Sequence, residues 1–287
     1  MAGWQDDLLA WSARTRRDLP WRDTRDPWAV LVSELMLQQT QVARVVGPYR
    51  AFLERFPDPA SCATSPSGEV LRMWAGLGYN RRALNLHRAA RRCVERHDGR
   101  LPSSLPELLA LPGVGPYTAR AVLAFAYEAD VGVVDTNAAR VHARLAGGRL
   151  AHREVQAAAD DAVPPGAGWA WNSAVLDLGA TVCTKRSPRC AVCPVTKWCA
   201  WWLGGRPDPD PATGSAGTSG TQSSFPGSDR EGRGRLVAAL CHGTVSDERL
   251  AEVMGWPDHS ARAERVAAGL LLEGMIHHDQ DGWRLPS

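Results

Sequence analysis

The sequence predicts an all-α protein in which a large helical body is followed by a small C-terminal module. Up to Leu203, apolar residues recur at helical spacing and no alternating run of strand length occurs. The composition then changes abruptly to Gly, Pro, Ser, Thr and Asp. We therefore divide the chain into a body at 1–203, a flexible linker at 204–227 and a module at 228–287.

The helices of the body are predicted from their apolar spacing and from the glycines that end them. One helical stretch ends at Gly78 and another near Asp98-Gly99, because glycine commonly follows the last turn of a helix. A short helix is expected at 105–109, and an alanine-rich helix runs from Thr118 to Tyr127. The spacing is set by Trp28, Leu31, Leu35, Val42, Val45, Val46, Tyr49, Leu53, Val70, Leu71, Trp74, Leu77, Leu84, Leu86, Ala90 and Val94.

The C-terminal module is predicted to be winged-helix-like. Helices are expected at 234–240, 247–254 and 261–273, followed by a short hairpin around an Asp281-Gly282 turn. Modules of this shape bind DNA or proteins, so the shape alone does not give a function. Arginines near the start of the module are offset by acidic residues in its later helices, so we expect no strong electrostatic contact with DNA.

Composition excludes several classes of protein. With 287 residues, of which 44% are hydrophobic, the chain buries a core without disulfides. It holds no apolar run of about 18 residues and starts without a signal peptide, so we expect a cytoplasmic protein with no membrane partner. The net charge of +2 leaves a nucleic-acid partner open.

Four of the seven cysteines form a cluster. Cys183, Cys190, Cys193 and Cys199 are separated by six, two and five residues. In a cytoplasmic chain, such a cluster favours metal or redox chemistry over disulfides.

Two further motifs suggest chemistry. The turn at 111–115, Leu-Pro-Gly-Val-Gly, lies between helical stretches, and its backbone N–H groups suit a DNA phosphate, although a plain turn is the alternative. Asp135 follows an apolar run and precedes a helical stretch, so it fits both an N-cap and a catalytic carboxylate.

The order of these motifs resembles the helix-hairpin-helix DNA glycosylases of the endonuclease III superfamily, which implies a two-lobed helical body. The cysteine spacing resembles that superfamily's [4Fe–4S] loop, so the resemblance implies that the four cysteines hold this cluster, with a zinc site as the alternative. Three N-terminal motifs, at 19–22, 32–42 and 76–79, resemble the adenine glycosylases of the MutY type. The resemblance runs from about Leu8 to Leu203.

The resemblance assigns catalytic roles to Glu34, Asp135 and Tyr117. Glu34 protonates N7 of adenine, Asp135 stays ionised and stabilises the sugar cation, and Tyr117 positions them. Two carboxylates suit this cleavage, as in glycoside hydrolysis, and the acid must hold its proton near neutral pH. The alternative for Glu34 is a solvated helix face.

The resemblance also implies contacts with double-stranded DNA that carries a mismatch or 8-oxoguanine. The target base must be flipped out, and Gln39 and Tyr79 fill the gap, with Leu77 and Thr40 near the opposite base. The implied substrate and DNA contacts are Arg17, Arg22, Gln39, Thr40, Leu77, Tyr79, Gly113, Gly115 and Asn137. Further candidates for phosphate contacts are Arg81, Arg82, Arg88, Arg91, Arg92, Lys185, Arg186 and Arg189.

Lysine scarcity favours a glycosylase that does not cut the DNA backbone. Superfamily members that cut it carry a lysine where this chain has Tyr117, and a Schiff base requires an amine. The only lysines, Lys185 and Lys197, lie in the cysteine loop. We therefore expect a monofunctional enzyme of base excision repair, acting as a monomer on the bacterial nucleoid.

Three departures from the family pattern bear on specificity. Asn172-Ser173 stands where many members carry Asn-Gln or Asn-Glu, Asn80 replaces a usual tyrosine, and the tail is too short for the β domain that often verifies 8-oxoguanine. A thymine or uracil mismatch glycosylase and a non-catalytic DNA-binding regulator are the alternatives. Glu34 in its motif favours adenine, and the presence of both carboxylates argues against a regulator.

Overall fold

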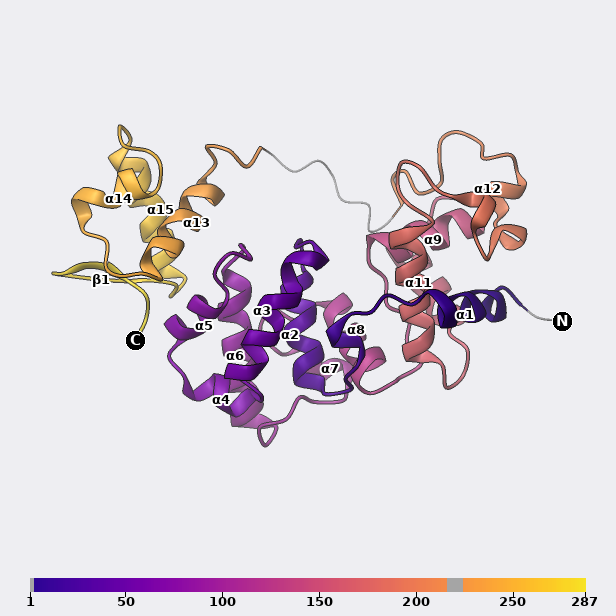
Figure 1. Cartoon of the computed structure of the whole chain (residues 1–287), viewed down its shortest axis with the longest axis horizontal. Coiled ribbons are helices and arrows are strands. Elements are labelled where there is room, and N and C mark those ends of the chain that lie inside the picture. Colours follow the sequence, from indigo (N-terminus) through magenta and orange to yellow (C-terminus); the bar gives the residue numbers. More distant parts are fainter. Residues whose placement is uncertain (1–2, 216–223) are drawn as a thin grey trace. The chain divides into compact units, whose positions relative to one another are not determined.

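The computed structural model describes residues 3–215 and 224–287 and confirms the all-α prediction (Figure 1). The chain divides into two compact units, each built from separate stretches of sequence. Of the described residues, unit 1 comprises 3–30, 103–106 and 114–215, and unit 2 comprises 31–102, 107–113 and 224–287. The domain division drawn from composition stays a prediction, because these contacts group the C-terminal module with part of the body.

Unit 1 is built around helix α11 (Gly168–Thr181), which packs against three other helices, α1, α8 and α9. Trp171 and Leu178 of α11 are buried in one cluster with Leu8 of α1 and Val141 of α9. The other helices of unit 1 are α1 (Trp4–Thr15), α8 (Pro116–Ala126), α9 (Thr136–Ala146), α10 (His152–Ala162) and α12 (Ala200–Leu203), with 3-10 turns η1 (Pro20–Arg22), η2 (Cys190–Val192) and η3 (Thr196–Trp198).

Unit 2 packs α4 and α5 against the long helix α6, and it also holds the C-terminal module. Its helices are α3 (Val42–Arg55), α4 (Pro59–Thr64), α5 (Ser67–Met73), α6 (Arg81–Arg96), α13 (Asp229–Leu240), α14 (Asp247–Val253) and α15 (Ser260–Leu272). Two helices, α2 (Pro27–Leu37) and α7 (Leu105–Leu109), contribute residues to both units. In the described residues, no helix is both long and apolar enough to cross a bilayer.

The C-terminal module has the three helices and the hairpin that the sequence predicts. Helix α13 begins five residues earlier than predicted, because the side chain of Ser228 caps it by accepting a hydrogen bond from the backbone N–H of Glu231. Strands β1 (His277–Asp279) and β2 (Gly282–Arg284) are antiparallel, and Asp279 pairs with Gly282. The turn is therefore at residues 280–281, and the predicted Asp281-Gly282 turn is wrong by one residue. Val245 adds a further bridge to Trp283.

One helix of unit 2 is shorter than predicted, and the difference matters for function. The apolar spacing from Val70 to Leu77 predicts a helix that stops at Gly78, but α5 ends at Met73. Gly76 and Gly78 both have positive φ, which turns the chain into a loop ahead of α6. Leu77 and Tyr79 therefore lie on a loop rather than on a helix.

Candidate functional site

Asp135 is the N-cap of helix α9. Its Oδ1 accepts hydrogen bonds from the backbone N–H groups of Asn137 and Ala138 at 2.8 and 2.7 Å, and its Oδ2 accepts one from the Asn137 side chain at 2.8 Å. The positive end of the helix favours a negative charge here. The N-cap reading and the catalytic reading are therefore compatible, since the same contacts fix the carboxylate in a half-buried position.

Asn137 links Asp135 to the cysteine loop through a buried arginine. The Oδ1 of Asn137 accepts a hydrogen bond from Arg140 at 2.8 Å, and Arg140 also donates to the backbone carbonyls of Gly179 and Cys183 at 2.7 Å each. Helices α9 and α11 approach closely at Gly179, because a Cβ there would lie 2.7 Å from the Cβ of Asn137. The sequence analysis missed Arg140, since a buried arginine on a helix has no distinguishing pattern.

The loop that precedes Asp135 is held by Asn172 of α11. The Asn172 side chain accepts a hydrogen bond from the Val133 N–H at 2.7 Å and donates to the carbonyl of Val131 at 2.8 Å. Tyr117, in the first turn of α8, packs against the cluster that contains Val133. Ser173 is buried, and its Oγ has no hydrogen-bond partner within the described part of the chain. Asn172 therefore supports the loop that leads to Asp135, and Ser173 stands where many members of the family carry Gln or Glu.

The glycine turn has the geometry of a tight helix–helix connection. Gly113 has a φ of +79°, and a Cβ at this position would lie 2.6 Å from the Cβ of Asn85. Gly115 is the N-cap of α8, and Pro116 follows at the first helical position, where its missing N–H costs nothing. Only glycine fits position 113, so the geometry of the turn alone accounts for the glycine there. A DNA phosphate as the ligand of this turn stays a prediction.

Glu34 lies on α2 and is only 5% exposed. The neighbouring side chains Ser33, Leu35 and Met36 are buried as well, so Glu34 is not on a solvated helix face. Glu34 belongs to unit 2 and Asp135 to unit 1.

Gln39 and Tyr79, the two residues expected to enter the DNA, share an unusual backbone conformation. Gln39 has a φ of +55° and Tyr79 a φ of +47°, a region that non-glycine residues seldom adopt. Both side chains are exposed. Backbone strain of this kind is often retained at functional sites, which supports the expectation that these two residues act on DNA.

Arg82 holds the Gln39 and Tyr79 loops together in unit 2. It is 7% exposed and donates to the carbonyls of Met36, Gln38 and Gly78 at 2.9, 2.6 and 2.9 Å. It also donates to the side chain of Thr40 at 3.1 Å. Further contacts join Arg82 to the carbonyls of Leu35, Leu77 and Tyr79. The expectation that Arg82 contacts a phosphate is wrong, because its guanidinium is already occupied with backbone groups of the protein.

Arg17 and Arg22 both bind the buried carboxylate of Asp177 on α11. The two guanidinium nitrogens of Arg22 lie 2.5 and 2.9 Å from Asp177, and Nε of Arg17 donates to the same group. Although burial alone would raise the pKa of Asp177, the hydrogen bonds and charges of Arg22 and Arg17 lower it. Within unit 1, Arg17 and Arg22 compensate the negative charge of Asp177. Their role as substrate contacts stays a prediction.

The four clustered cysteines lie around one small cavity of about 20 Å³ in unit 1. Within the described residues, no three Cys, His, Asp or Glu side chains are gathered closely enough to hold one metal ion. A zinc ion would require four sulfurs about 2.3 Å from a single centre. The four cysteines are therefore candidate ligands of one common group, either the iron–sulfur cluster or the zinc ion.

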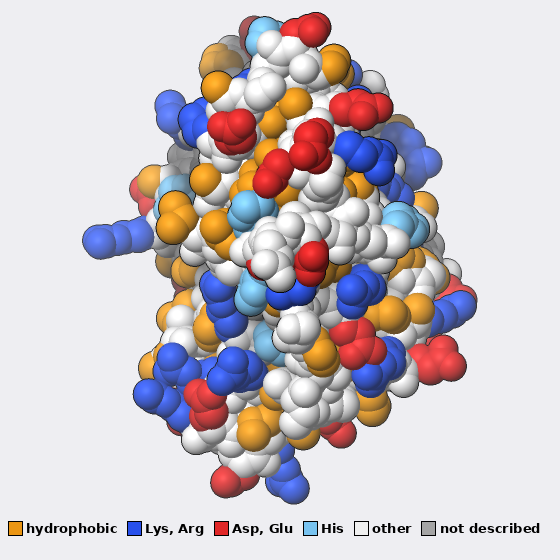
Figure 2. All heavy atoms as spheres, turned by 90° about the vertical axis from the view of Figure 1, so that its left-hand side faces the viewer, with side chains coloured by type: hydrophobic (Ala, Val, Ile, Leu, Met, Phe, Trp, Pro, Cys, Tyr) orange, Lys and Arg blue, Asp and Glu red, His pale blue; other side chains and the backbone are white. Residues whose placement is uncertain are grey.

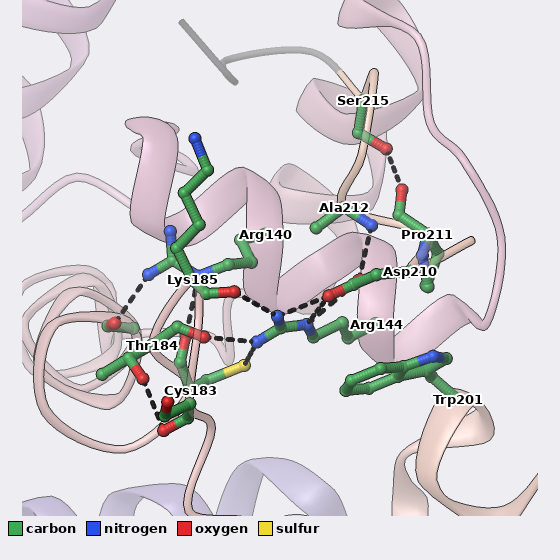
Figure 3. A network of polar contacts seen from close by, with 12 residues as sticks. Arg140, Arg144, Cys183, Thr184, Lys185, Trp201, Asp210, Pro211, Ala212 and Ser215 are labelled. Atoms are coloured by element: carbon green, nitrogen blue, oxygen red, sulfur yellow. Dashed lines mark hydrogen bonds and ion pairs between the residues drawn. The ribbon is translucent and has the colours of Figure 1, made fainter. Parts of the chain in front are cut away.

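Arg144 joins the cysteine loop to the segment that follows it (Figure 3). It is 2% exposed and donates to the Sγ of Cys183 at 3.3 Å, while its guanidinium lies 4.7 Å from the ring centre of Trp201. Asp210 binds the same guanidinium at 2.6 Å. Ser215, five residues further along, is also buried and accepts a hydrogen bond from the Leu150 N–H at 3.1 Å.

The segment at 206–215, which we call the strap, is therefore fixed to unit 1 by Asp210 and Ser215. The composition of this stretch predicts a flexible linker. Composition gives no sign of the contacts that Asp210 and Ser215 make with unit 1. The rest of the predicted linker includes residues 216–223, which lie outside the described residues.

The basic residues of the cysteine loop differ in their availability. Lys185, Arg186 and Arg189 are all exposed. Of these three, Arg189 donates a hydrogen bond to the Thr181 carbonyl at 2.6 Å. Lys197 forms an ion pair with Asp7 at 3.0 Å. Lys185 and Arg186 are therefore the best placed of this group for a phosphate contact.

Comparison with known proteins relates this geometry to established families. Residues 32–165 match the family described as "HhH-GPD superfamily base excision DNA repair protein". A Mycobacterium tuberculosis protein named adenine DNA glycosylase is 41% identical over an alignment of 297 residues, gaps included. The alignment covers 96% of this chain and 91% of that protein. An adenine DNA glycosylase of Mycolicibacterium smegmatis is 40% identical, with 96% and 93% covered.

Solved structures share the fold over most of the body. A thermostable thymine-DNA glycosylase matches with a TM-score of 0.67 and 31% identity, over 70% of this chain and 95% of that one. An endonuclease III in a non-covalent DNA complex matches with a TM-score of 0.61 at 23% identity, over 71% and 99% of the two chains, which shows the fold alone. Because the match to the mycobacterial enzymes spans nearly the whole of both sequences, the chain belongs to the MutY-type adenine DNA glycosylases of the HhH-GPD superfamily.

Proposed function

We propose that this protein is a monofunctional DNA glycosylase of base excision repair, which removes adenine mispaired with 8-oxoguanine or guanine. The observation that carries the proposal is the carboxylate of Asp135, fixed at the start of α9 by three hydrogen bonds. The names of the mycobacterial relatives support adenine as the base. We further propose that it acts as a monomer on DNA in the bacterial nucleoid.

In the proposed reaction, the bond between the deoxyribose C1′ and adenine N9 breaks. Glu34 donates a proton to N7, so that the bonding electron pair leaves with a neutral adenine. The carboxylate of Asp135 stabilises the positive charge that develops on the sugar. A water molecule then adds at C1′ and gives up a proton to the solvent, from which Glu34 takes one back, and the product is an abasic site in an unbroken strand.

The Gln39 and Tyr79 loops are proposed to fill the duplex after adenine is flipped out. The side chains of Gln39 and Tyr79 are exposed. Arg82 fixes the backbone next to each of them, because it donates to the carbonyls of Gln38 and Gly78. A rigid pair of loops lowers the cost of holding an unstacked duplex. Leu77 and Thr40 are proposed to lie near the opposite base.

The four cysteine thiolates are proposed to hold a [4Fe–4S] cluster, whose chemistry here is structural: it would cross-link the loop after α11. Cys183, Cys190, Cys193 and Cys199 surround a common cavity, which supports the fit. Thiolate sulfur is the ordinary ligand of such clusters. Arg144 donates to Cys183 and would offset part of the negative charge of the loaded loop.

A thymine or uracil mismatch glycosylase is the second candidate. It is favoured by the 31% identity and TM-score of 0.67 to a thymine-DNA glycosylase. The two candidates differ in the leaving base: adenine offers N7 as a site for protonation, whereas a pyrimidine has no N7. The buried position of Glu34 on α2 suits such an acid and supports adenine.

The proposed function is tested by base release from a panel of mispaired duplexes. We expect free adenine from adenine opposite 8-oxoguanine and opposite guanine. Release of thymine or uracil opposite guanine, with adenine left in place, would favour the second candidate. Chromatography of the released bases makes the distinction directly.

The absence of a hairpin lysine predicts that no covalent enzyme–DNA adduct accumulates. Tyr117 occupies the position of that lysine at the start of α8, and phenols form no Schiff base. We expect abasic DNA to stay uncut until alkali is added, and borohydride to trap little adduct. Tyr117→Lys is the matched variant, which should gain borohydride-trapped adduct if this position faces the sugar. Efficient trapping by the unaltered chain would contradict the monofunctional assignment.

A further inference from the structure

A groove with a cavity volume of about 800 Å³ lies within unit 2, between the Gln39 and Tyr79 loops and helix α13 of the C-terminal module. Cavities of roughly this size hold ligands as large as a nucleotide. Its lining includes Gln39, Leu77 and Tyr79 on one side and Phe225 and Arg230 on the other. The C-terminal module therefore shares a surface with the residues expected to act on DNA.

The groove is lined by basic side chains, but two of them are already paired: Arg233 forms an ion pair with Glu273 at 2.7 Å, and the guanidinium of Arg82 is occupied by backbone carbonyls. Its lining residues include five arginines and no carboxylate. The arginines are Arg44, Arg81, Arg82, Arg230 and Arg233. By contrast, acidic and basic side chains are interspersed on the face of the molecule drawn in Figure 2. Arg230 is therefore the residue through which the module itself adds positive charge to the groove, a local feature that its mixed overall charge conceals.

The two walls of the groove are attached to each other. The backbone N–H of Gly68 donates to the carbonyl of Pro286 at 3.1 Å, and Arg88 of α6 donates to the carbonyl of Glu273 at 2.8 Å. Across the groove, Arg230 reaches the hydroxyl of Tyr79 at 3.5 Å. These contacts hold α13 in position opposite the Tyr79 loop within unit 2.

The groove also offers an aromatic surface beside its charges. Phe225 is 54% exposed, although large apolar side chains are normally buried, and Arg230 lies 5.9 Å from its ring centre. Tyr79, on the opposite wall, is 44% exposed. Arginines that bind phosphates, together with exposed aromatic rings that stack on bases, are the usual surface for an unpaired stretch of nucleic acid.

We propose that this groove binds the DNA strand opposite the adenine, and that Arg230 and Phe225 of the C-terminal module contact its phosphate and its base. The inference rests on the proposed function for the identity of the strand, since Leu77, which lines the groove, is expected near the opposite base. It gives the module a direct part in substrate binding. The contact with DNA itself is tested independently of catalysis.

The test compares variants of the full chain for binding to a duplex with 8-oxoguanine opposite 2′-fluoroadenosine, whose fluorine prevents base release. Arg230→Ala should weaken binding about tenfold and lower the slope of log K against log salt by about 0.9, which corresponds to one phosphate contact. Phe225→Ala should weaken binding by about fivefold or more with the slope unchanged, because stacking releases no counterions. Arg230→Lys should restore the slope.

The matched control is Arg249→Ala on α14, which removes an exposed arginine of the same module outside the groove lining. This variant should bind like the unaltered chain. Equal salt slopes for Arg230→Ala and Arg249→Ala, or unchanged affinity in Phe225→Ala, would overturn the proposal. If Arg230→Ala does not fold, Phe225→Ala still carries the comparison. Base release from unmodified adenine is measured separately, so a failure of the proposed function is recognised without the binding result.

Discussion

Replacing Asp135 with asparagine is expected to slow adenine release by about 10²–10⁴-fold in a single turnover, while DNA binding survives. The substitution removes the charge that stabilises the sugar cation. It preserves the helix cap, because asparagine is as good an N-cap as aspartate and its Oδ1 can still accept from the N–H groups of Asn137 and Ala138. The amide nitrogen replaces Oδ2 and no longer accepts from the Asn137 side chain, so unchanged DNA binding is the control that separates the lost charge from a disturbed loop.

Replacing Glu34 with glutamine is expected to cause a loss of the same order, because an amide cannot protonate N7. Glutamine has nearly the same shape, so the buried surroundings of position 34 on α2 should be retained. Near-normal single-turnover excision by both Asp135→Asn and Glu34→Gln would refute the two-carboxylate mechanism. Binding to the 2′-fluoroadenosine duplex shows whether each variant still recognises its substrate.

Removing the strap is expected to destabilise the cysteine loop, which is the second large effect. A chain shortened after Gly205 loses Asp210, and the buried guanidinium of Arg144 is then left without its carboxylate. Leaving one partner of a buried pair uncompensated is strongly destabilising; because Asp210 is partly exposed, we expect about 2–3 kcal/mol, lower than for a fully buried pair. The composition assigns this stretch to a flexible linker, whereas the anchors at Asp210 and Ser215 make it a stabilising part of unit 1.

A chain shortened after Ser215 is the matched control, since the two shortened chains differ only in residues 206–215. We expect it to retain the iron content and the visible absorption of the full chain, whereas the chain ending at Gly205 loses iron to a chelator faster. Asp210→Asn in the full chain should reproduce the faster loss. If all three chains lose iron at the same rate, the strap has no role in holding the cysteine loop.

The parts of the protein that the sequence predicts well are those with a short, periodic or closely spaced pattern. Helical spacing predicts most helices of the body, and the α-helical class follows from it. The N-cap position of Asp135 follows from local backbone chemistry, because the N–H groups that it binds lie within three residues of it. Position 113 demands glycine, because the backbone there has a positive φ and leaves no space for a Cβ. The three module helices are also found, with α13 starting five residues earlier through its Ser228 cap.

The parts that the sequence does not predict depend on buried polar contacts between residues far apart in the chain. Arg82 binds carbonyls more than 40 positions away, and Arg144 binds Asp210 from a stretch whose composition indicates a linker. Arg17 and Arg22 meet Asp177 in the same way. In each case an arginine on a helix or loop has the same local pattern as a solvated one, and only the fold distinguishes them.

The most direct measurement is a single-turnover reaction on a duplex with adenine opposite 8-oxoguanine, with both the released base and the DNA strand identified by mass spectrometry. Parallel reactions carry adenine opposite guanine, thymine opposite guanine and uracil opposite guanine. We expect free adenine from the first two duplexes, no thymine or uracil from the others, and an intact abasic strand throughout. Release of a pyrimidine in preference to adenine, or a strand already cut before alkali, would contradict the assignment of this chain as a monofunctional adenine glycosylase.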